Sequence, residues 1–388
     1  MSRPLLDALE NVITRQKKCM AIIDFGGTLS HGWLTSAILY YQIEHMKFAF
    51  TPDQFHEVFY FSTEDTKHCF DRDLLAVDHK GKAIPSTNFY ATLHGYYKEL
   101  YDWKHVSSLQ DIRTTTTFQQ FKLLMLFYHQ QFTRMMKENE GCRKLGRYQV
   151  SRWWLYMPME SVKTLAYEMG QYKAEIVENV KVEGKATIKK QKVSVKYVFD
   201  FTLFEAPVEL IRILNDYGIY TLILTGAEHT MVSHYNEKAI HATSAYAVQY
   251  THNAPKEMAH DSLHTATFAG FVEPATTPPI LEGKSQIIHQ IMDIKRLEPC
   301  IVLADSASDY GMVEPMKEGI VIAVQSAGHF PFHDLVIERH PEAKGGRGPV
   351  HVFKQYIKDG NWVSYVNHED PSTSSLMFKP EYPGFKVR

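Results

Sequence analysis

The segment that decides the fold is Ala21-Ile22-Ile23-Asp24-Phe25-Gly26-Gly27-Thr28, an apolar run that ends at a carboxylate and two glycines. A short apolar run bounded by glycine is typical of a buried strand in a parallel sheet. Sheets of this kind place their functional groups at the carboxyl ends of the strands. The segment therefore predicts an α/β fold with Asp24 at the edge of the sheet that carries the site.

Two further apolar runs end in polar residues in the same way. They are Leu222-Ile223-Leu224-Thr225-Gly226 and Ile301-Val302-Leu303-Ala304-Asp305. Asp309 follows the second run, and Gly283-Lys284 lies between the two. A carboxylate, a hydroxyl, an ammonium and an acidic pair would converge at one sheet edge, and phosphoryl transfer requires such positioning and charge stabilisation.

The order and chemistry of these segments resemble the haloacid dehalogenase (HAD) superfamily of phosphohydrolases, in a phosphoserine-phosphatase-like arrangement. The resemblance implies a doubly wound, mainly parallel sheet with a Rossmann-like core and an inserted cap. It assigns the nucleophile to Asp24 and catalytic phosphate-binding roles to Thr225 and Lys284. Thr28 and Gly226 are further substrate-binding positions in this assignment.

The resemblance also implies a Mg²⁺ site. Its ligands are Asp24, the backbone carbonyl of Gly26, and the acidic pair Asp305 and Asp309. Mg²⁺ prefers hard oxygen ligands of this kind and would offset the repulsion between a carboxylate nucleophile and a phosphate dianion. The mixed anhydride formed on an aspartate is itself readily hydrolysed, which divides one difficult step into two.

Gly26 departs from the family pattern, which has a second aspartate at this position. That residue protonates the leaving oxygen and later activates the hydrolytic water. Three interpretations follow: an enzyme whose leaving group needs no proton from this position, such as a carbon-phosphorus bond hydrolase with a cap lysine; a slowed phosphatase; or a protein that binds a phosphate ester without efficient turnover. We expect Mg²⁺-dependent hydrolysis of a phosphorylated small molecule or phosphorylated side chain through an aspartyl-phosphate at Asp24.

Each site residue also has a structural alternative. Asp24 could cap the following turn, and Thr225 could be a turn residue. Lys284 could begin an exposed helix. Asp305 and Asp309 could cap a helix that starts near Asp309.

The spacing between Asp24 and Thr225 greatly exceeds one strand-helix-strand unit. We predict a core from residues 1–30 and 202–365, a mostly helical cap over 31–201 and a loosely ordered tail over 366–388. A β-hairpin near 180–198, with solvated lysines, is expected at the end of the cap. The predicted cap helices are 33–50, 89–103, 118–138 and 161–177.

Composition narrows the partners and surroundings. The 42 basic and 44 acidic side chains give no overall field that favours nucleic acid or an anionic membrane. No stretch has the length of a membrane span, so a cytoplasmic location is expected. The cysteines are widely separated, and we expect reduced, buried thiols at Cys19, Cys69, Cys142 and Cys300.

Aromatic residues and histidines in the chain allow two uses. The aromatic residues are expected to pack in the cap, and the alternative is a cage for a quaternary ammonium group. They are Trp33, Tyr40, Tyr41, Trp153, Trp154 and Tyr156. His229 and His234 follow the Thr225 strand, where a pocket role is the alternative to ordinary packing.

Overall fold

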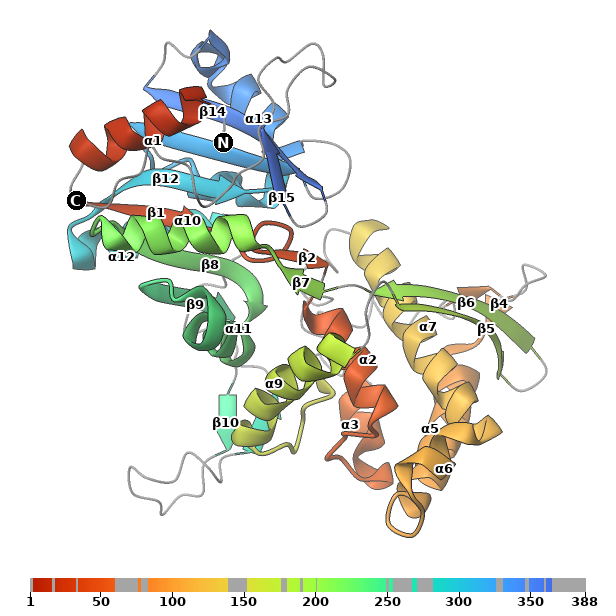
Figure 1. Cartoon of the computed structure of the whole chain (residues 1–388). Helices are drawn as coiled ribbons and strands as arrows, with labels where there is room; N and C mark the ends of the chain where they lie inside the picture. The colour runs from red at the N-terminus through yellow and green to blue at the C-terminus, as the bar shows by residue number, and fades with distance from the viewer. Residues whose placement is uncertain are drawn as a thin grey trace. The chain divides into compact units, whose positions relative to one another are not determined.

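Seven strands of the computed structural model form one sheet, in the order β15-β14-β13-β12-β1-β8-β9 (Figure 1). All neighbouring strands are parallel except β15, which pairs antiparallel with β14. The predicted doubly wound, mainly parallel α/β architecture is confirmed. The strands are β1 Cys19–Ile23, β8 Tyr220–Glu228, β9 Ser244–Val248, β12 Glu298–Ala304, β13 Gly319–Gln325, β14 Val350–Lys358 and β15 Asn361–Ser364.

The structure describes the larger part of the chain. The described residues are 3–15, 18–32, 34–59, 76–77, 83–138, 152–175, 180–188, 191–199, 201–248, 251–253, 267–270, 282–325, 331–345, 349–358 and 361–364. Trp33, Cys69, Cys142 and the predicted tail 366–388 lie outside these ranges.

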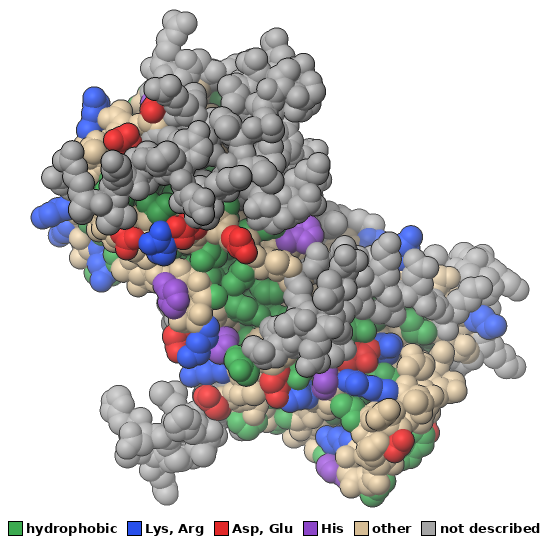
Figure 2. Space-filling view, viewed as in Figure 1, with side chains coloured by type: hydrophobic (Ala, Val, Ile, Leu, Met, Phe, Trp, Pro, Cys, Tyr) green, Lys and Arg blue, Asp and Glu red, His purple; other side chains and the backbone are tan. Residues whose placement is uncertain are grey.

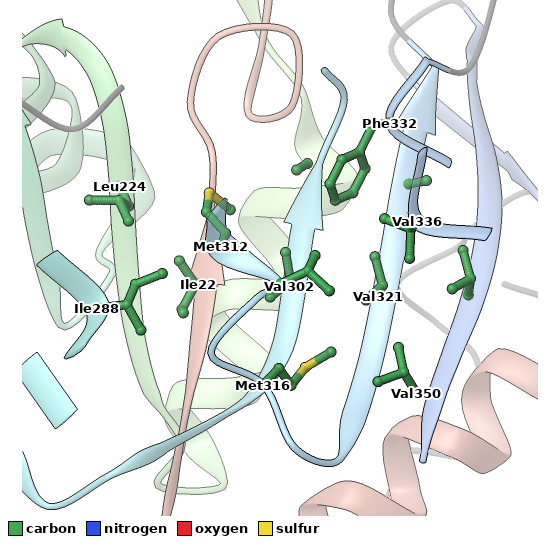
Figure 3. Packing of buried hydrophobic residues seen from close by; sticks show 14 of the residues in the cluster. Ile22, Leu224, Ile288, Val302, Met312, Met316, Val321, Phe332, Val336 and Val350 are labelled. Carbon is green, nitrogen blue, oxygen red and sulfur yellow. The ribbon is translucent and has the colours of Figure 1, made fainter. Parts of the chain in front are cut away.

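Helices cover both faces of the sheet. Strand residues of alternate parity point to opposite faces, so Ile22 and Val302 face one layer while Ile23 and Leu303 face the other. The first layer packs against α12, α13 and the short 3-10 helix η4, through Ile288, Phe332 and Met312 (Figure 3). On the other face, α1 contacts β13, and α10 contacts β8 and β15. The helices are α1 Arg3–Arg15, α10 Glu205–Asp216, α11 His229–Tyr235, α12 Glu282–Lys295, η4 Ala307–Met312 and α13 Pro331–Arg339.

The helix before β8 ends at a glycine. Gly218 has φ +75, a left-handed conformation that glycine adopts without steric cost. The Gly218 N–H donates to the carbonyl of Asn215 at 2.9 Å, and the chain then enters β8. This turn sets the start of the strand that carries Thr225.

The chain divides into two compact units. Unit 1 contains Met1–Leu34, Phe201–Gln249 and Glu273–Arg388, and unit 2 contains Thr35–Asp200 and Tyr250–Val272. The predicted cap did not include Tyr250–Val272, whose short strands β10 Thr251–Asn253 and β11 Thr267–Gly270 pair with each other. Such short strands leave little periodicity in the sequence to reveal them.

A two-stranded ribbon marks where the chain leaves and re-enters unit 1. Strands β2 Ser30–Gly32 and β7 Phe201–Leu203 are antiparallel, with Gly32 opposite Phe201. The Phe204 N–H also donates to the carbonyl of Leu29 at 2.9 Å. The loop that carries Asp24 and the return point of the chain are thus tied together within unit 1.

Unit 2 is mainly helical, as predicted. The central helix α7 is buried on every side over residues 123–129, while a hairpin of β5 and β6 packs against it. The hairpin lies where the sequence placed it, near 180–198. The elements are α2 Leu34–Glu44, α3 Phe55–Phe59, α5 Ser86–Trp103, α6 Leu109–Thr114, α7 Thr116–Glu138, α9 Met159–Glu175, β3 Ala76–Val77, β4 Ala83–Ile84, β5 Val180–Ile188 and β6 Gln191–Phe199.

The aromatic residues of unit 2 pack in its interior. Trp153 and Trp154 are both 0% exposed, and the Trp154 Nε1–H donates to Gln42 Oε1 at 2.9 Å. Tyr40 and Tyr41 are also buried. These four rings therefore pack as expected, while Tyr156 is half-buried and its hydroxyl donates to Glu57.

His129 on α7 is buried among these rings. Its Nδ1 lies 2.8 Å from the Tyr197 hydroxyl, and Ser36 also hydrogen-bonds Tyr197. Burial lowers the pKa of His129 from 6.5 to about 4, so the folded protein holds a neutral imidazole at pH 7.

We expect unit 2 to lose about 3 kcal/mol of stability between pH 7 and pH 4 through His129. The unfolded chain binds a proton below pH 6.5, whereas folded His129 takes one only near pH 4. The free energy of unfolding therefore decreases as the pH is lowered across this window, by about 1.4 kcal/mol for each unit of pKa difference. Urea unfolding followed by tryptophan fluorescence at several pH values measures this loss. His129→Gln should remove this part of the pH dependence, while the exposed His56→Gln should retain it; equal profiles for the two variants would contradict the assignment.

A disulfide joins Cys19 of β1 to Cys300 of β12, with Cα atoms 5.8 Å apart. The expectation of reduced thiols is therefore wrong for this pair. An irregularity between Met20 and Ala21 shifts the register of β1 against β12 and leaves Cys300 as the extra residue. Disulfides persist in oxidising compartments, whereas the cytoplasm expected from the sequence keeps thiols reduced.

The surface carries mixed charges. On the face shown in Figure 2, acidic and basic side chains are interspersed rather than gathered by sign. Among the described residues, no helix combines the length and apolar character needed to cross a membrane.

Candidate active site

Parallel pairing brings the first and fourth sequence segments together. In the register of β1 and β12, Ile23 lies opposite Leu303, and the Asp24 N–H donates to the Leu303 carbonyl at 2.9 Å. Asp24 and Asp305 therefore emerge at the same edge of the sheet. Strand β8 flanks β1 on the other side, with Ile223 opposite Ile23, so Thr225 emerges at this edge as well.

Lys284 is the centre of the site. Its side chain projects from the first turn of α12 and is 2% exposed. The Nζ donates to Asp24 Oδ1 at 2.8 Å and to Asp309 Oδ1 at 2.5 Å, and lies 3.5 Å from the Met312 sulfur. The alternative of an exposed helix start is wrong for Lys284, because its ammonium is enclosed by protein acceptors.

Asp309 is held in place from its other side. Its Oδ2 accepts hydrogen bonds from the Ser306 N–H at 3.1 Å and from the Ser306 hydroxyl at 2.7 Å. Asp309 therefore completes a capping box at the start of η4, as the structural alternative proposed, and also pairs with Lys284. Both of its oxygens are committed.

Burial and charge shape the electrostatics of this cluster. Burial first, and then the neighbouring Asp309 carboxylate, raise the pKa of Asp24, while Lys284 lowers it. Burial alone lowers the pKa of Lys284, but the two carboxylates outweigh it and hold the pKa above its ordinary value. Lys284 is therefore cationic in the folded protein, and a further cation beside the carboxylates would be favoured.

Gly27 lets the loop approach Asp305. It has φ +90, and a Cβ built there would lie 2.2 Å from Asp305 Oδ2. The Thr28 hydroxyl donates to Asp305 Oδ1 at 3.3 Å. Thr28, predicted to bind substrate, is fully buried and orients Asp305.

Gly26 is different from its neighbour. A Cβ built on Gly26 meets nothing within 4 Å, and its φ lies outside the left-handed region. The backbone would therefore accept the aspartate that the family pattern has here. The absence of a side chain at Gly26 is a property of the site rather than a demand of the fold.

Thr225 and Gly226 lie where β8 becomes irregular. The pairing of β8 with β9 shifts between Leu224 and Glu228. Thr225 is 3% exposed, and its hydroxyl accepts a hydrogen bond from the Ala227 N–H at 3.2 Å. Thr225 thus takes part in a local turn, as its structural alternative proposed, at the same sheet edge as Asp24.

Glu228 is a buried acid near the site that the sequence did not single out. Its two oxygens each accept a hydrogen bond at 2.8 Å, from the N–H groups of Thr230 and Met231 at the start of α11. Burial raises the pKa of Glu228 to about 7, against the opposing effect of these hydrogen bonds. Glutamate is not among the residues that typically cap a helix, so no local sequence signal marked this position.

The histidines after β8 have local neighbours, although the buried His229 Nδ1 has no hydrogen-bond partner among the described residues. His229 Nε2 lies 3.2 Å from the Ser233 hydroxyl, one turn along α11. The His234 ring lies against Tyr235, with centroids 6.1 Å apart.

The acidic residues suit a divalent cation. Asp24, Asp305 and Asp309 each offer an oxygen, and these oxygens lie within 4.8 Å of one another. Three carboxylates form a hard-oxygen set of the kind that Mg²⁺ prefers. Because Asp309 is already bound to Lys284 and Ser306, Asp24 and Asp305 are the better candidates for direct ligands.

Solved structures share the architecture. A conserved protein of unknown function from Anaerococcus prevotii DSM 20548 superposes with a TM-score of 0.66 over 90% of this chain and 91% of its own, at 15% sequence identity. This similarity supports the fold alone. No protein-family model matches the sequence, and no curated protein sequence does.

Two structures of proteins with named activities are less similar to this chain. A HAD family hydrolase from Salmonella enterica serovar Typhi aligns with a TM-score of 0.32 and 8% identity, over 83% of this chain and 72% of its own. Cytosolic 5'-nucleotidase IIIB bound to cytidine gives 0.34 and 12%, over 90% and 86%. Both TM-scores are below 0.5 and carry no argument about this chain.

Proposed function

We propose that the chain is a HAD-like, Mg²⁺-dependent phosphohydrolase that acts on a phosphorylated small molecule or a phosphorylated side chain through an aspartyl-phosphate at Asp24. The observation that carries the proposal is the buried Lys284 ammonium, bonded at once to Asp24 and Asp309, with Asp305 beside them. Burying several charged groups costs free energy, and a well-packed apolar core would be as stable without them. Such clusters are therefore typical of functional sites.

The residues have distinct roles in this proposal. Asp24 supplies the attacking oxygen, and Lys284 orients it and balances its charge. Thr225 and the Gly226 backbone bind phosphoryl oxygens at the edge of the sheet. Asp24, the Gly26 carbonyl and Asp305 would hold Mg²⁺, with Asp309 beside them, and the ion would supply positive charge against the phosphate dianion.

A second candidate rests on Gly26. Without an acid at this position, the chain would bind a phosphate ester and turn it over poorly, since general acid-base catalysis contributes about a hundred- to ten-thousand-fold. A carbon-phosphorus bond hydrolase would tolerate Gly26 but would need a cap lysine that forms an imine with its substrate.

A phosphatase screen with and without Mg²⁺ separates these candidates. The proposed enzyme releases phosphate only when the metal is present, and treatment with a chelator abolishes release. Saturable binding of phosphate analogues with no release from any ester or anhydride would favour the binding protein. Imine trapping with borohydride in the presence of a phosphonoaldehyde would identify the carbon-phosphorus hydrolase.

Asp305→Ala should weaken Mg²⁺ binding by at least about tenfold, because it deletes a hard oxygen ligand. Calorimetric titration of Mg²⁺ into the native and variant proteins measures the change directly, without any substrate. Glu298→Ala, an exposed carboxylate at the opposite end of the same strand, is the matched control and should bind Mg²⁺ as the native protein does. Identical affinities in the two variants would remove Asp305 from the metal site.

A further inference from the structure

We propose that the site is adapted to phosphoryl donors whose leaving group departs as a weakly basic anion, such as an acyl phosphate, rather than to alkyl phosphate monoesters. The inference rests on the proposed function and specifies its substrate class. An alkoxide leaves only when it is protonated, whereas a carboxylate leaves as it is. An alkyl ester would therefore need an acid such as a carboxyl group at this sheet edge to protonate its leaving oxygen.

The carboxyl groups around the nucleophile are each committed to another partner. Asp309 binds Lys284 through Oδ1 and Ser306 through Oδ2. Asp305 accepts from Thr28 and packs against Gly27. Asp24 is the attacking group itself and cannot also serve as the acid.

The remaining buried acid of this sheet edge is committed as well. Both oxygens of Glu228 face the backbone N–H groups of Thr230 and Met231, at 2.8 Å each. Among the described residues of unit 1, these four are the buried or half-buried acids at the carboxyl ends of β1, β8 and β12. None of them is placed as a free proton donor beside Asp24.

The missing donor is not a consequence of crowding. A Cβ at Gly26 has open space to 4 Å and an ordinary backbone conformation, so an aspartate would fit without strain. Gly27, one residue later, has no such freedom, because its Cβ would collide with Asp305. The loop therefore requires glycine at one of the two positions only, and the glycine at position 26 sets the chemistry.

The reaction balances without an acid. An Asp24 oxygen attacks phosphorus, and the bond from phosphorus to the acyl oxygen breaks, so the carboxylate departs with the electron pair. Water then attacks phosphorus, and the bond to Asp24 breaks and restores its carboxylate. The phosphate leaves with both hydrogens of the water as dihydrogen phosphate.

The test compares acetyl phosphate with ethyl phosphate as donors, using kcat/KM, which reports on the steps up to the first phosphoryl transfer. Background hydrolysis is measured with Asp24→Asn. We expect the preference of the native protein for acetyl phosphate to exceed that of Gly26→Asp by about a hundred- to ten-thousand-fold, because the added acid accelerates only the leaving group that needs a proton. Gly26→Asn is the matched control: it has the shape of aspartate without its acidic proton and should keep the native preference.

A second measurement needs no variant. A series of phenyl phosphates with leaving groups of increasing pKa should show a steep fall in native kcat/KM. A flat series, or the same donor preference in native protein and Gly26→Asp, would overturn the inference while Mg²⁺-dependent turnover still supports the phosphohydrolase. Failure of every donor in both native protein and Gly26→Asp would instead overturn the proposed function.

Discussion

Asp24→Asn should lower Mg²⁺-dependent phosphate release by roughly ten-thousand-fold or more, on the scale seen when an enzyme loses its nucleophile. The amide keeps the shape of the carboxylate but cannot attack phosphorus. Asp24 is 6% exposed, and its Oδ1 lies 2.8 Å from the Lys284 ammonium, so the substitution changes a group already oriented for reaction.

The measurement is phosphate release under single-turnover conditions, with acid quenching to trap any phosphorylated protein. The native protein should yield an acid-stable, hydroxylamine-sensitive phosphoryl group, and Asp24→Asn should yield none. Asp293→Asn, an exposed change on α12, is the matched control and should behave as the native protein does. Undiminished release from Asp24→Asn would exclude this carboxylate as the nucleophile.

Lys284→Met should destabilise the protein by about 3–5 kcal/mol, the usual cost of removing one partner from a buried charge pair. The substitution leaves Asp24 and Asp309 buried together without the cation that lies between them. Methionine approximates the length of the lysine stem, so the loss reflects charge more than volume.

Urea unfolding at pH 7 measures this effect. Lys317→Met is the control, because Lys317 pairs with Glu298 at the surface, where such pairs contribute about 0–1 kcal/mol. Combining Lys284→Met with Asp309→Asn should recover part of the loss, since the second change removes one of the two opposed carboxylates. A Lys284→Met protein as stable as Lys317→Met would contradict the assigned charge cluster.

The sequence predicted the strand ends of this site and their convergence. Apolar runs before Asp24, Thr225 and Asp305 specify buried parallel strands, and the carboxyl ends of neighbouring parallel strands meet at one edge. Local pattern was sufficient for these strands because burial on both faces demands continuous apolar residues.

Other features depend on contacts that no local pattern records. The disulfide joins Cys19 and Cys300, which are 281 residues apart in the sequence, and the register of their two strands is irregular next to it. The burial of Lys284 was equally undetectable, because Gly283-Lys284-Ser285 also describes an exposed helix start. Glu228 is the N-cap residue of α11 because β8 ends there, and the amino-acid sequence specifies the ends of strands only weakly.

Because of the β2–β7 ribbon, the segment inserted between these strands can be replaced by the corresponding segment of another protein. Gly32 and Phe201 face each other across two antiparallel strands, so the chain departs and returns at neighbouring points and the first strand of the sheet is not displaced. A graft between these residues would preserve the register of the ribbon beside the loop that carries Asp24. Tyr250–Val272 belongs to the same unit, so a chimera must transplant both segments together, as a two-piece cassette.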